Sequence, residues 1–168
     1  LKKKIKNCIL VGERKGLIIN GFDYGNNPAV IKDKDFSGKT AVITTSNGTL
    51  GLVNAKNADE RLVGSFVNIQ ATIDYIKKKN PEIVTLASLG TLGHIAEEDD
   101  LCAEFIKDSL EGKPPDIEET KKKVIASKKG QIFLDETKLA YPEPDLHAAL
   151  EFDKFNFVLK VIEENDLL

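Results

Sequence analysis

The chain has 168 residues, of which 41% are apolar and 30% are charged, and its formal net charge is −3. This length and composition favour one soluble domain over residues 1–168, with a core of useful size. The charge balance gives no basic footprint for nucleic acid, no apolar run approaches the roughly 20 residues that span a bilayer, and two cysteines make no disulfide framework, so we expect a cytoplasmic protein without such partners.

The first half of the chain predicts three strands and one helix. Short apolar runs rich in β-branched residues occupy residues 8–11, 40–45 and 62–63. Continuous runs of this kind are typical of strands buried on both faces of a parallel sheet. After them Ile69, Ile73 and Ile76 recur at helical spacing, and Asn68 is placed to cap that helix.

The second half predicts two more strands and three helices. Residues 83–87 and 157–161 are the apolar runs, and helical patterns cover residues 101–110, 116–129 and 145–153. Gly130 is expected to end the second of these helices. Strands that alternate with helices predict an α/β fold, with a mostly parallel sheet and helices on both of its faces. The segment 112–144 is the least strand-like and predicts a helical cap or edge.

Small polar residues follow three of the predicted strands directly before a helix. They are residues 46–49 (SNGT), Gly64, Ser65 and Asn68, and residues 88–93 (SLGTLG). In open α/β sheets, ligands bind outside the carboxyl ends of the strands, where helix N-termini offer free N–H groups to anions. Each loop alone is also typical of an ordinary turn. Three of them on one edge favour an anionic ligand.

Charged residues near these loops allow two interpretations each. Arg14 after the first strand is able to hold a phosphate or carboxylate, or to form a surface pair with Glu13. The acids at 97–100 either stabilise a helix start or supply ligands for Mg²⁺. The loop at 21–28 (GFDYGNNP) is either part of the site or an ordered surface loop.

Cysteine and histidine give weaker signals. Cys102 falls on the apolar side of its helix, where a cysteine usually packs as a small apolar residue. His94 is a minor candidate for a general acid, and His147 is expected at the surface.

Five of these strings together resemble the 2-phosphosulfolactate phosphatase family of coenzyme M biosynthesis. In the family's order and spacing they are residues 12–14 (GER), 21–28 (GFDYGNNP), 44–49 (TTSNGT), 64–68 (GSFVN) and 90–103 (GTLGHIAEEDDLCA). The resemblance covers most of the chain, strongly from residue 10 to residue 105. It places the chain in the last two-thirds of a longer family domain, with the ligand site at the carboxyl ends of the strands.

The resemblance implies a Mg²⁺-dependent hydrolysis of 2-phospho-3-sulfolactate, a small anionic phosphate ester, to 3-sulfolactate and phosphate. By the same resemblance, Asp99, Asp23 and Arg14 are the expected catalytic residues, and Asp99 and Glu98 are the expected metal ligands. The residues expected to bind substrate are Glu13, Asn26, Thr45, Asn47, Gly48, Thr49, Asn68, Thr91 and Gly93.

The chain also departs from the family pattern. It has no match to the family's N-terminal Asp-hydrophobic-Leu-Arg-Ala string, Leu50 stands where Arg is common, and Glu104 stands where Gly is usual. Two alternatives therefore stay open. One is a phosphatase for another small phosphorylated hydroxy acid, and the other is a diverged or inactive relative that serves as an anion-binding or assembly module. Sheet edges left exposed without that unit favour a homo-oligomer.

Overall fold

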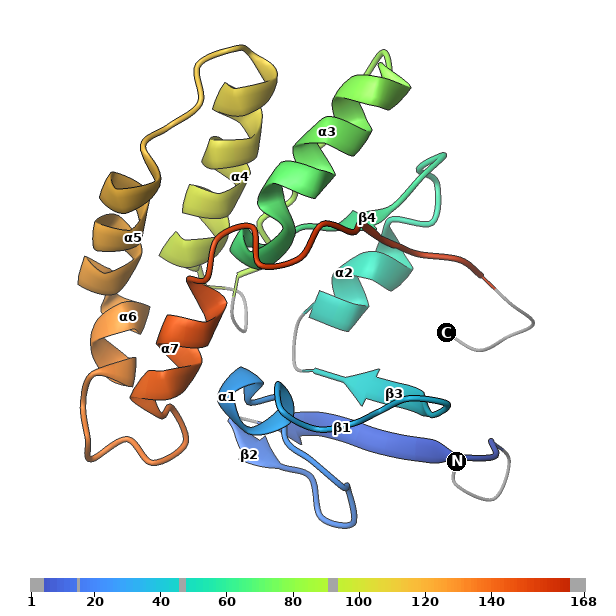
Figure 1. The fold of residues 1–168 in the computed structure, drawn as a ribbon, viewed down its shortest axis with the longest axis vertical. Coiled ribbons are helices and arrows are strands. Elements are labelled where there is room, and N and C mark those ends of the chain that lie inside the picture. Colours follow the sequence, from blue (N-terminus) through green and yellow to red (C-terminus); the bar gives the residue numbers. More distant parts are fainter. Residues whose placement is uncertain (1–4, 15, 46–47, 91–93, 164–168) are drawn as a thin grey trace.

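The computed structural model describes residues 5–14, 16–45, 48–90 and 94–163 (Figure 1). Within these residues the fold is mixed α/β, with two small sheets, seven α-helices and one 3₁₀ turn. Figure 1 places the three-stranded sheet and the helices α3 and α4 toward opposite ends of the longest axis. None of the described helices is long and apolar enough to cross a bilayer.

The three-stranded sheet has the order β2-β1-β3. Strand β1 (Cys8–Arg14) runs parallel to β3 (Thr40–Thr44), and Gly12 stands opposite Thr44 in their register. Strand β2 (Leu17–Ile18) turns back antiparallel to β1. The two predicted strands at the start of the chain are confirmed, and their carboxyl ends meet at one edge of the sheet.

The second sheet pairs β4 (Leu62–Val63) with β5 (Leu159–Lys160), antiparallel. Only one of the three strand pairs in the described residues is parallel, so the expectation of one mostly parallel sheet is not met. The expected strand at 83–87 is wrong, because residues 81–90 form no strand and Ile83 is 77% exposed. An apolar run becomes a strand only where it pairs its backbone hydrogen bonds with a neighbouring strand, and among the described residues this run pairs with none.

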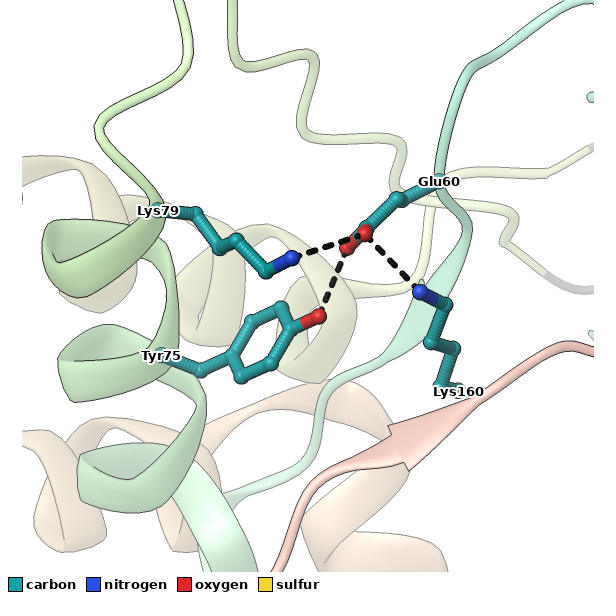
Figure 2. A network of polar contacts seen from close by, with 4 residues as sticks. All are labelled: Glu60, Tyr75, Lys79 and Lys160. Atoms are coloured by element: carbon teal, nitrogen blue, oxygen red, sulfur yellow. Dashed lines mark hydrogen bonds and ion pairs between the residues drawn. The ribbon is translucent and has the colours of Figure 1, made fainter.

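A network of polar contacts links the second sheet to helix α3 (Ile69–Lys79), as Figure 2 shows. One carboxylate oxygen of Glu60 accepts a hydrogen bond from Lys160 Nζ at 2.8 Å and lies 3.3 Å from Lys79 Nζ. The other oxygen accepts a hydrogen bond from the Tyr75 hydroxyl at 2.8 Å. Glu60 therefore joins the segment before β4 to α3 and to β5.

Most of the core lies between helices. The remaining elements are α1 (Pro28–Ile31), α2 (Gly48–Asn54), the 3₁₀ turn η1 (Phe66–Asn68), α4 (Glu97–Leu110), α5 (Ile117–Ala126), α6 (Lys128–Phe133) and α7 (Glu143–Ala149). The buried cluster consists of Phe66, Ile69, Ile73, Phe105, Ile106, Val124, Leu146 and Leu150. Burial of each such side chain stabilises the fold by roughly 1.5–3 kcal/mol. The predicted apolar face of α3 is confirmed, but it packs on other helices rather than on a sheet.

The helix expected over 116–129 is divided in the structure. Ser127 adopts an extended backbone between α5 and α6, its hydroxyl donates to the Val124 carbonyl, and it accepts a hydrogen bond from Gly130 N. Gly130 does not end a helix as expected but lies inside α6. A Cβ at Gly130 would lie 2.3 Å from the Val124 carbonyl oxygen, so the glycine allows α6 to pack closely against the end of α5.

Candidate functional site

The parallel pairing of β1 and β3 places Arg14 beside the end of β3. Its guanidinium donates from Nη2 to the Thr44 hydroxyl at 3.1 Å and from Nη1 to the Glu13 carbonyl at 2.7 Å. The side chain therefore reaches across both strand ends while Arg14 itself stays exposed. An exposed guanidinium held in this way is suited to bind an anionic group.

Close packing of backbone holds this edge in place. A Cβ at Gly12 would lie 2.5 Å from the Thr44 carbonyl oxygen, so only glycine allows the two strands to approach so closely. Glu13, 9% exposed, accepts a hydrogen bond from Gly16 N at 2.8 Å and so closes the turn after β1. The sequence placed Glu13 among the substrate-binding residues, and the structure places its carboxylate in this turn.

The loop at 21–28 extends the same sheet. Asp23 Oδ2 accepts a hydrogen bond from Leu10 N at 2.8 Å, and Tyr24 forms a parallel bridge with Val11. These contacts place Asp23 and Tyr24 beside β1, and Asn26 follows them as an exposed residue of the same loop. The carboxylate of Asp23 thus has a backbone partner in addition to any role in catalysis.

A buried acid that the sequence did not single out holds the end of this loop. Asp145 of α7 is 4% exposed, and its Oδ2 accepts a hydrogen bond from Asn27 Nδ2 at 2.6 Å. Its Oδ1 accepts from Ala29 N at 2.9 Å, at the start of α1. The sequence signal for Asp145 was only that of an acid in the first turn of a helix, which carries no information about a partner this far away.

The connection from β3 to α2 lies at the same strand end. Thr45 Oγ1 accepts a hydrogen bond from Thr49 N at 3.5 Å, and the Thr49 hydroxyl donates to the Thr45 carbonyl at 3.5 Å. Gly48 begins α2. Asn47, which the sequence also placed in the site, lies outside the described residues.

Asn68 is buried at 1% exposure, and its amide is bonded within the protein. Its Oδ1 accepts from Ser65 N at 3.1 Å and from the Ser65 hydroxyl at 2.9 Å, while its Nδ2 donates to the Phe157 carbonyl at 3.4 Å. Asn68 occupies the predicted N-cap position of α3, but its side chain makes no capping hydrogen bond to that helix and bonds to Ser65 instead. Its role in substrate binding stays a prediction, and these three contacts give it a role in the fold.

The acids at the start of α4 form a second group. Asp99 Oδ2 accepts a hydrogen bond from Gly90 N at 2.9 Å and so holds the backbone of Gly90 at the start of α4. Thr91 and Gly93 lie outside the described residues. Leu89, just before Gly90, meets α2, because a Cβ at Gly51 would lie 2.3 Å from Leu89 Cδ1.

Glu98 differs from its acidic neighbours. Its Oε2 atom is buried and has no hydrogen-bond partner among the described residues. Burial raises the pKa of the Glu98 carboxyl, the negative charges of Asp99 and Glu97 raise it further, and the positive charge of Lys129 opposes the rise. A carboxylate oxygen of this kind is suited to receive a cation or a proton.

Lys129 and Tyr141 form a contact near the turn after β1. Lys129 Nζ is 4.2 Å from the centroid of the Tyr141 ring and 6.0 Å from that of Phe133. A Cβ at Gly16 would lie 3.1 Å from the Tyr141 hydroxyl oxygen, which brings this ring to the turn after β1. In the sequence Lys129 was only the last residue of a lysine-rich helix, so nothing marked it as part of a site.

The remaining candidates take structural positions. Cys102 packs against the helical core, and burial, with a further effect of the Asp99 charge, raises the pKa of its thiol to about 12. This agrees with its interpretation as a packing residue, because a thiol of such pKa is not a ready nucleophile. His147 is exposed and lies 3.0 Å from a Glu143 oxygen, which confirms the expected surface position.

The described residues contain no group of three or more His, Cys, Asp or Glu side chains that could hold a metal ion. The unpartnered Oε2 of Glu98 nevertheless fits a cation. Mg²⁺ needs only one or two protein carboxylates, because water and substrate phosphate complete its coordination. The chemistry of Glu98 and Asp99 is therefore compatible with this metal.

Together these contacts define a mixed α/β protein with a polar site where β1 and β3 end. Arg14 and Thr45 lie at these strand ends and the loop at 21–28 lies beside β1, while Glu98 and Asp99 form a separate acidic group in the first turn of α4. In sequence comparison, the family model of 2-phosphosulpholactate phosphatase matches residues 1–163. The chain belongs to the 2-phosphosulfolactate phosphatase family.

Individual relatives agree with this assignment. A protein of Caldicellulosiruptor saccharolyticus named "Probable 2-phosphosulfolactate phosphatase" is 34% identical over 178 residues, which cover 99% of this chain and 67% of the relative. Proteins with the same name from Clostridium perfringens and Thermoplasma volcanium are 36% and 35% identical and match 82% and 96% of this chain. The matches cover 58% and 72% of these two relatives.

Proposed function

We propose that the chain is a phosphatase that hydrolyses 2-phospho-3-sulfolactate to 3-sulfolactate and inorganic phosphate. The observation that carries this proposal is the family match over residues 1–163. The position of Arg14 supports it, because a guanidinium across two parallel strand ends stands where α/β proteins commonly bind anionic ligands. Because the relatives are longer than the matched region, the activity is inferred from them for this chain.

Hydrolysis of a phosphate ester depends mainly on positioning and on neutralising charge. In this proposal Arg14 binds one anionic group of the substrate through its exposed guanidinium. Thr45 and Thr49 offer short polar groups at the same strand end. Asp23 and Asn26 line the site from the loop at 21–28, and Asp23 keeps that loop on β1 through its bond to Leu10 N.

Glu98 and Asp99 are the proposed ligands of Mg²⁺. When bound, the metal would supply positive charge beside the substrate phosphate. Asp99 is held by Gly90 N through one oxygen, and Glu98 presents an oxygen without a protein partner among the described residues. The two side chains come from the first turn of α4, so a single element sets their spacing.

Phosphate release from 2-phospho-3-sulfolactate in the presence of Mg²⁺ tests the proposal. The wild-type chain should release phosphate, and Asp99→Asn should lower the rate by about 10–100-fold, a loss typical even of outer-shell partners of metal ligands. Asparagine keeps an oxygen for Gly90 N, so the variant removes mainly the charge. Asp108→Asn is the matched control, because Asp108 is an acid near the other end of the same helix with a side chain that is 43% exposed.

Three outcomes decide between the alternatives. Near-normal turnover by Asp99→Asn would remove Asp99 from the mechanism. Binding of phosphate and 3-sulfolactate by the wild-type chain without turnover would identify an anion-binding relative instead of an enzyme. Turnover of another phosphorylated hydroxy acid, but not of 2-phospho-3-sulfolactate, would keep the reaction and change the substrate.

Metal binding has a test that does not depend on activity. Millimolar Mg²⁺ should raise the melting temperature of the wild-type chain, because a ligand that binds only the folded state stabilises it. Glu98→Gln should abolish this shift, and Glu97→Gln should retain it, since Glu97 is exposed and accepts a bond from Lys128 N. Equal shifts in both variants would exclude Glu98 as a ligand.

A further inference from the structure

Lys129 carries a positive charge that the fold holds in place without a direct anionic partner. Its ammonium lies 4.2 Å from the centroid of the Tyr141 ring, and the side chain is half-buried. Among the residues that the structure describes, no carboxylate forms an ion pair with this ammonium. Other lysines of the helical region do have such partners, at positions 107, 121 and 123.

The aromatic rings fix where this charge stands. Phe133 and Tyr141 meet edge to face with their centroids 5.5 Å apart, and Lys129 approaches both rings. Cation–π contacts of this kind restrict a flexible ammonium to one region while leaving some of its N–H donors unused. A lysine confined in this way gives up less freedom on binding a ligand than a lysine that projects into water.

The surroundings of Lys129 connect it to both sides of the candidate site. The Tyr141 hydroxyl adjoins Gly16, whose N–H donates to Glu13 in the turn after β1. The positive charge of Lys129 also acts on the carboxyl of Glu98 in the first turn of α4. Helix α6, which carries Lys129, packs against α4, α5 and α7. Lys129 is therefore linked through Tyr141 to the turn after β1 and through its charge to Glu98, which belong to the two groups of residues in the proposed site.

We propose that Lys129 is a substrate-binding residue, and that its ammonium contacts the oxygens of a phosphate or sulfonate group. This inference rests on the proposed phosphatase function of the same site. A substrate with two anionic groups brings more negative charge than Arg14 alone can balance, and lysine binds such oxygens as a point charge. Lys129 supplies the second cation from an element that lies 115 positions further along the chain than Arg14.

The test compares Lys129→Met with Lys128→Met, its neighbour on α6, whose side chain is exposed. The Michaelis constant for 2-phospho-3-sulfolactate should rise by about tenfold or more in Lys129→Met, as expected for loss of a charge-assisted hydrogen bond. It should stay within about twofold of the wild-type value in Lys128→Met, because surface changes away from the site have small effects. Lys129→Arg, which keeps the charge, should recover most of the loss.

A second substrate identifies the group that Lys129 contacts. With 2-phospholactate, which lacks the sulfonate, Lys129→Met should behave like the wild type if the ammonium binds sulfonate. It should lose affinity for both substrates if the ammonium binds phosphate. Calorimetry with inorganic phosphate and with 3-sulfolactate, used as separate probes, gives the same distinction without turnover.

The failure of this inference can be told from failure of the proposed function. If the wild-type chain turns over or binds these probes and Lys129→Met does so equally well, Lys129 has no part in binding and the function stands. An equal loss in Lys128→Met would show a general charge effect and also overturn the inference. If the wild-type chain neither turns over nor binds any probe, the proposed function itself fails and Lys129 has no ligand.

Discussion

At the scale of single residues, Asp145 is the acid whose surroundings most restrict it. It is almost fully buried, and both of its carboxylate oxygens accept hydrogen bonds, from the Asn27 side chain and from Ala29 N. Bonds to an ionised acceptor are stronger than bonds between neutral groups, and a buried donor without its acceptor is costly. Asp145 therefore positions the loop at 21–28 from a helix that does not itself carry a predicted site residue.

Replacement of Asp145 by alanine should lower the free energy of unfolding by about 1.5–3 kcal/mol, since it leaves two partly buried donors without an acceptor. Urea unfolding measures this loss. Asp33→Ala is the control, because Asp33 is an exposed acid just beyond α1, and its effect should stay within about 0.5 kcal/mol. Equal unfolding free energies of the two variants would show that the Asp145 contacts add nothing to stability.

Local patterns predicted where single residues lie within their own elements. Asn68 was expected at the start of a helix, and it occupies the N-cap position of α3, although its side chain bonds to Ser65 and does not cap that helix. Arg14 was expected at the end of the first strand, and β1 does end there. Asp145 and Lys129 escaped prediction because their partners come from distant parts of the chain, and an acid in a first helical turn or a lysine in a basic helix is ordinary.

At the scale of elements, the Glu60 network makes the attachment of β5 depend on pH. Hydrogen bonds from Lys160 and Tyr75 lower the pKa of the Glu60 carboxyl from 4.5 to about 2. The folded-state pKa is below that of the unfolded chain, so the ionised group stabilises the fold above about pH 4.5. This contribution is lost as the pH falls toward 2 and the carboxylate is protonated.

The difference in unfolding free energy between the wild type and Glu60→Gln should therefore be constant above pH 5 and vanish near pH 2. Urea unfolding at a series of pH values measures it, and subtraction removes the titration of the other acids. Glu82→Gln, at an exposed position, should show no such pH-dependent difference. A difference that persists at pH 2 would mean that the Glu60 charge does not hold β5.

Helices were easier to predict than strands in this chain. The face of α3 and the existence of α4, α5 and α7 follow from apolar spacing along a single segment. The prediction of a strand at 83–87 was wrong, because a strand also needs a neighbouring strand with which to pair. The apolar composition of a segment does not show whether such a neighbour exists. The break between α5 and α6 was not predicted, because a serine at position 127 is also compatible with a continuous helix. The sequence does not show that the Ser127 hydroxyl bonds to Val124 and Gly130.

At the scale of the whole molecule, apolar side chains remain exposed on β3, on α2 and in the segment that follows α3. Ile43 of β3 is 55% exposed, Val53 of α2 is 43% exposed, and Ile83 and Leu89 beyond α3 are 77% and 44% exposed. Among the described residues β3 pairs only with β1, so its other edge is also open. Open edges with apolar neighbours favour association.

We therefore expect the isolated chain to self-associate as its concentration rises. Sedimentation velocity over a series of concentrations measures this, and Ile83→Ser should reduce the association because it removes apolar area from this region. Leu139→Ser is the control. Leu139 is 90% exposed, but it lies on the connection between α6 and α7. A monomer at every concentration, or equal effects of the two changes, would contradict the expectation.

Of the overall architecture, the sequence predicted correctly only the fold class. Alternating strand and helix patterns correctly indicated a mixed α/β chain, but they did not show that the core would form between helices rather than over a sheet. The pattern of one segment records which face is buried, and it does not record what covers that face.

The bond between Asn27 and Asp145 also has a consequence for how the protein is made. The two residues are 118 positions apart, and a ribosome delivers the N-terminal part of a chain first. While synthesis has not reached α7, the loop at 21–28 exists without the carboxylate that later fixes it. Closing so long a separation is also slow compared with forming a local contact. This loop of the site is therefore completed by a residue that is made 118 positions later, and a nascent chain carries the loop before it holds it in its final position.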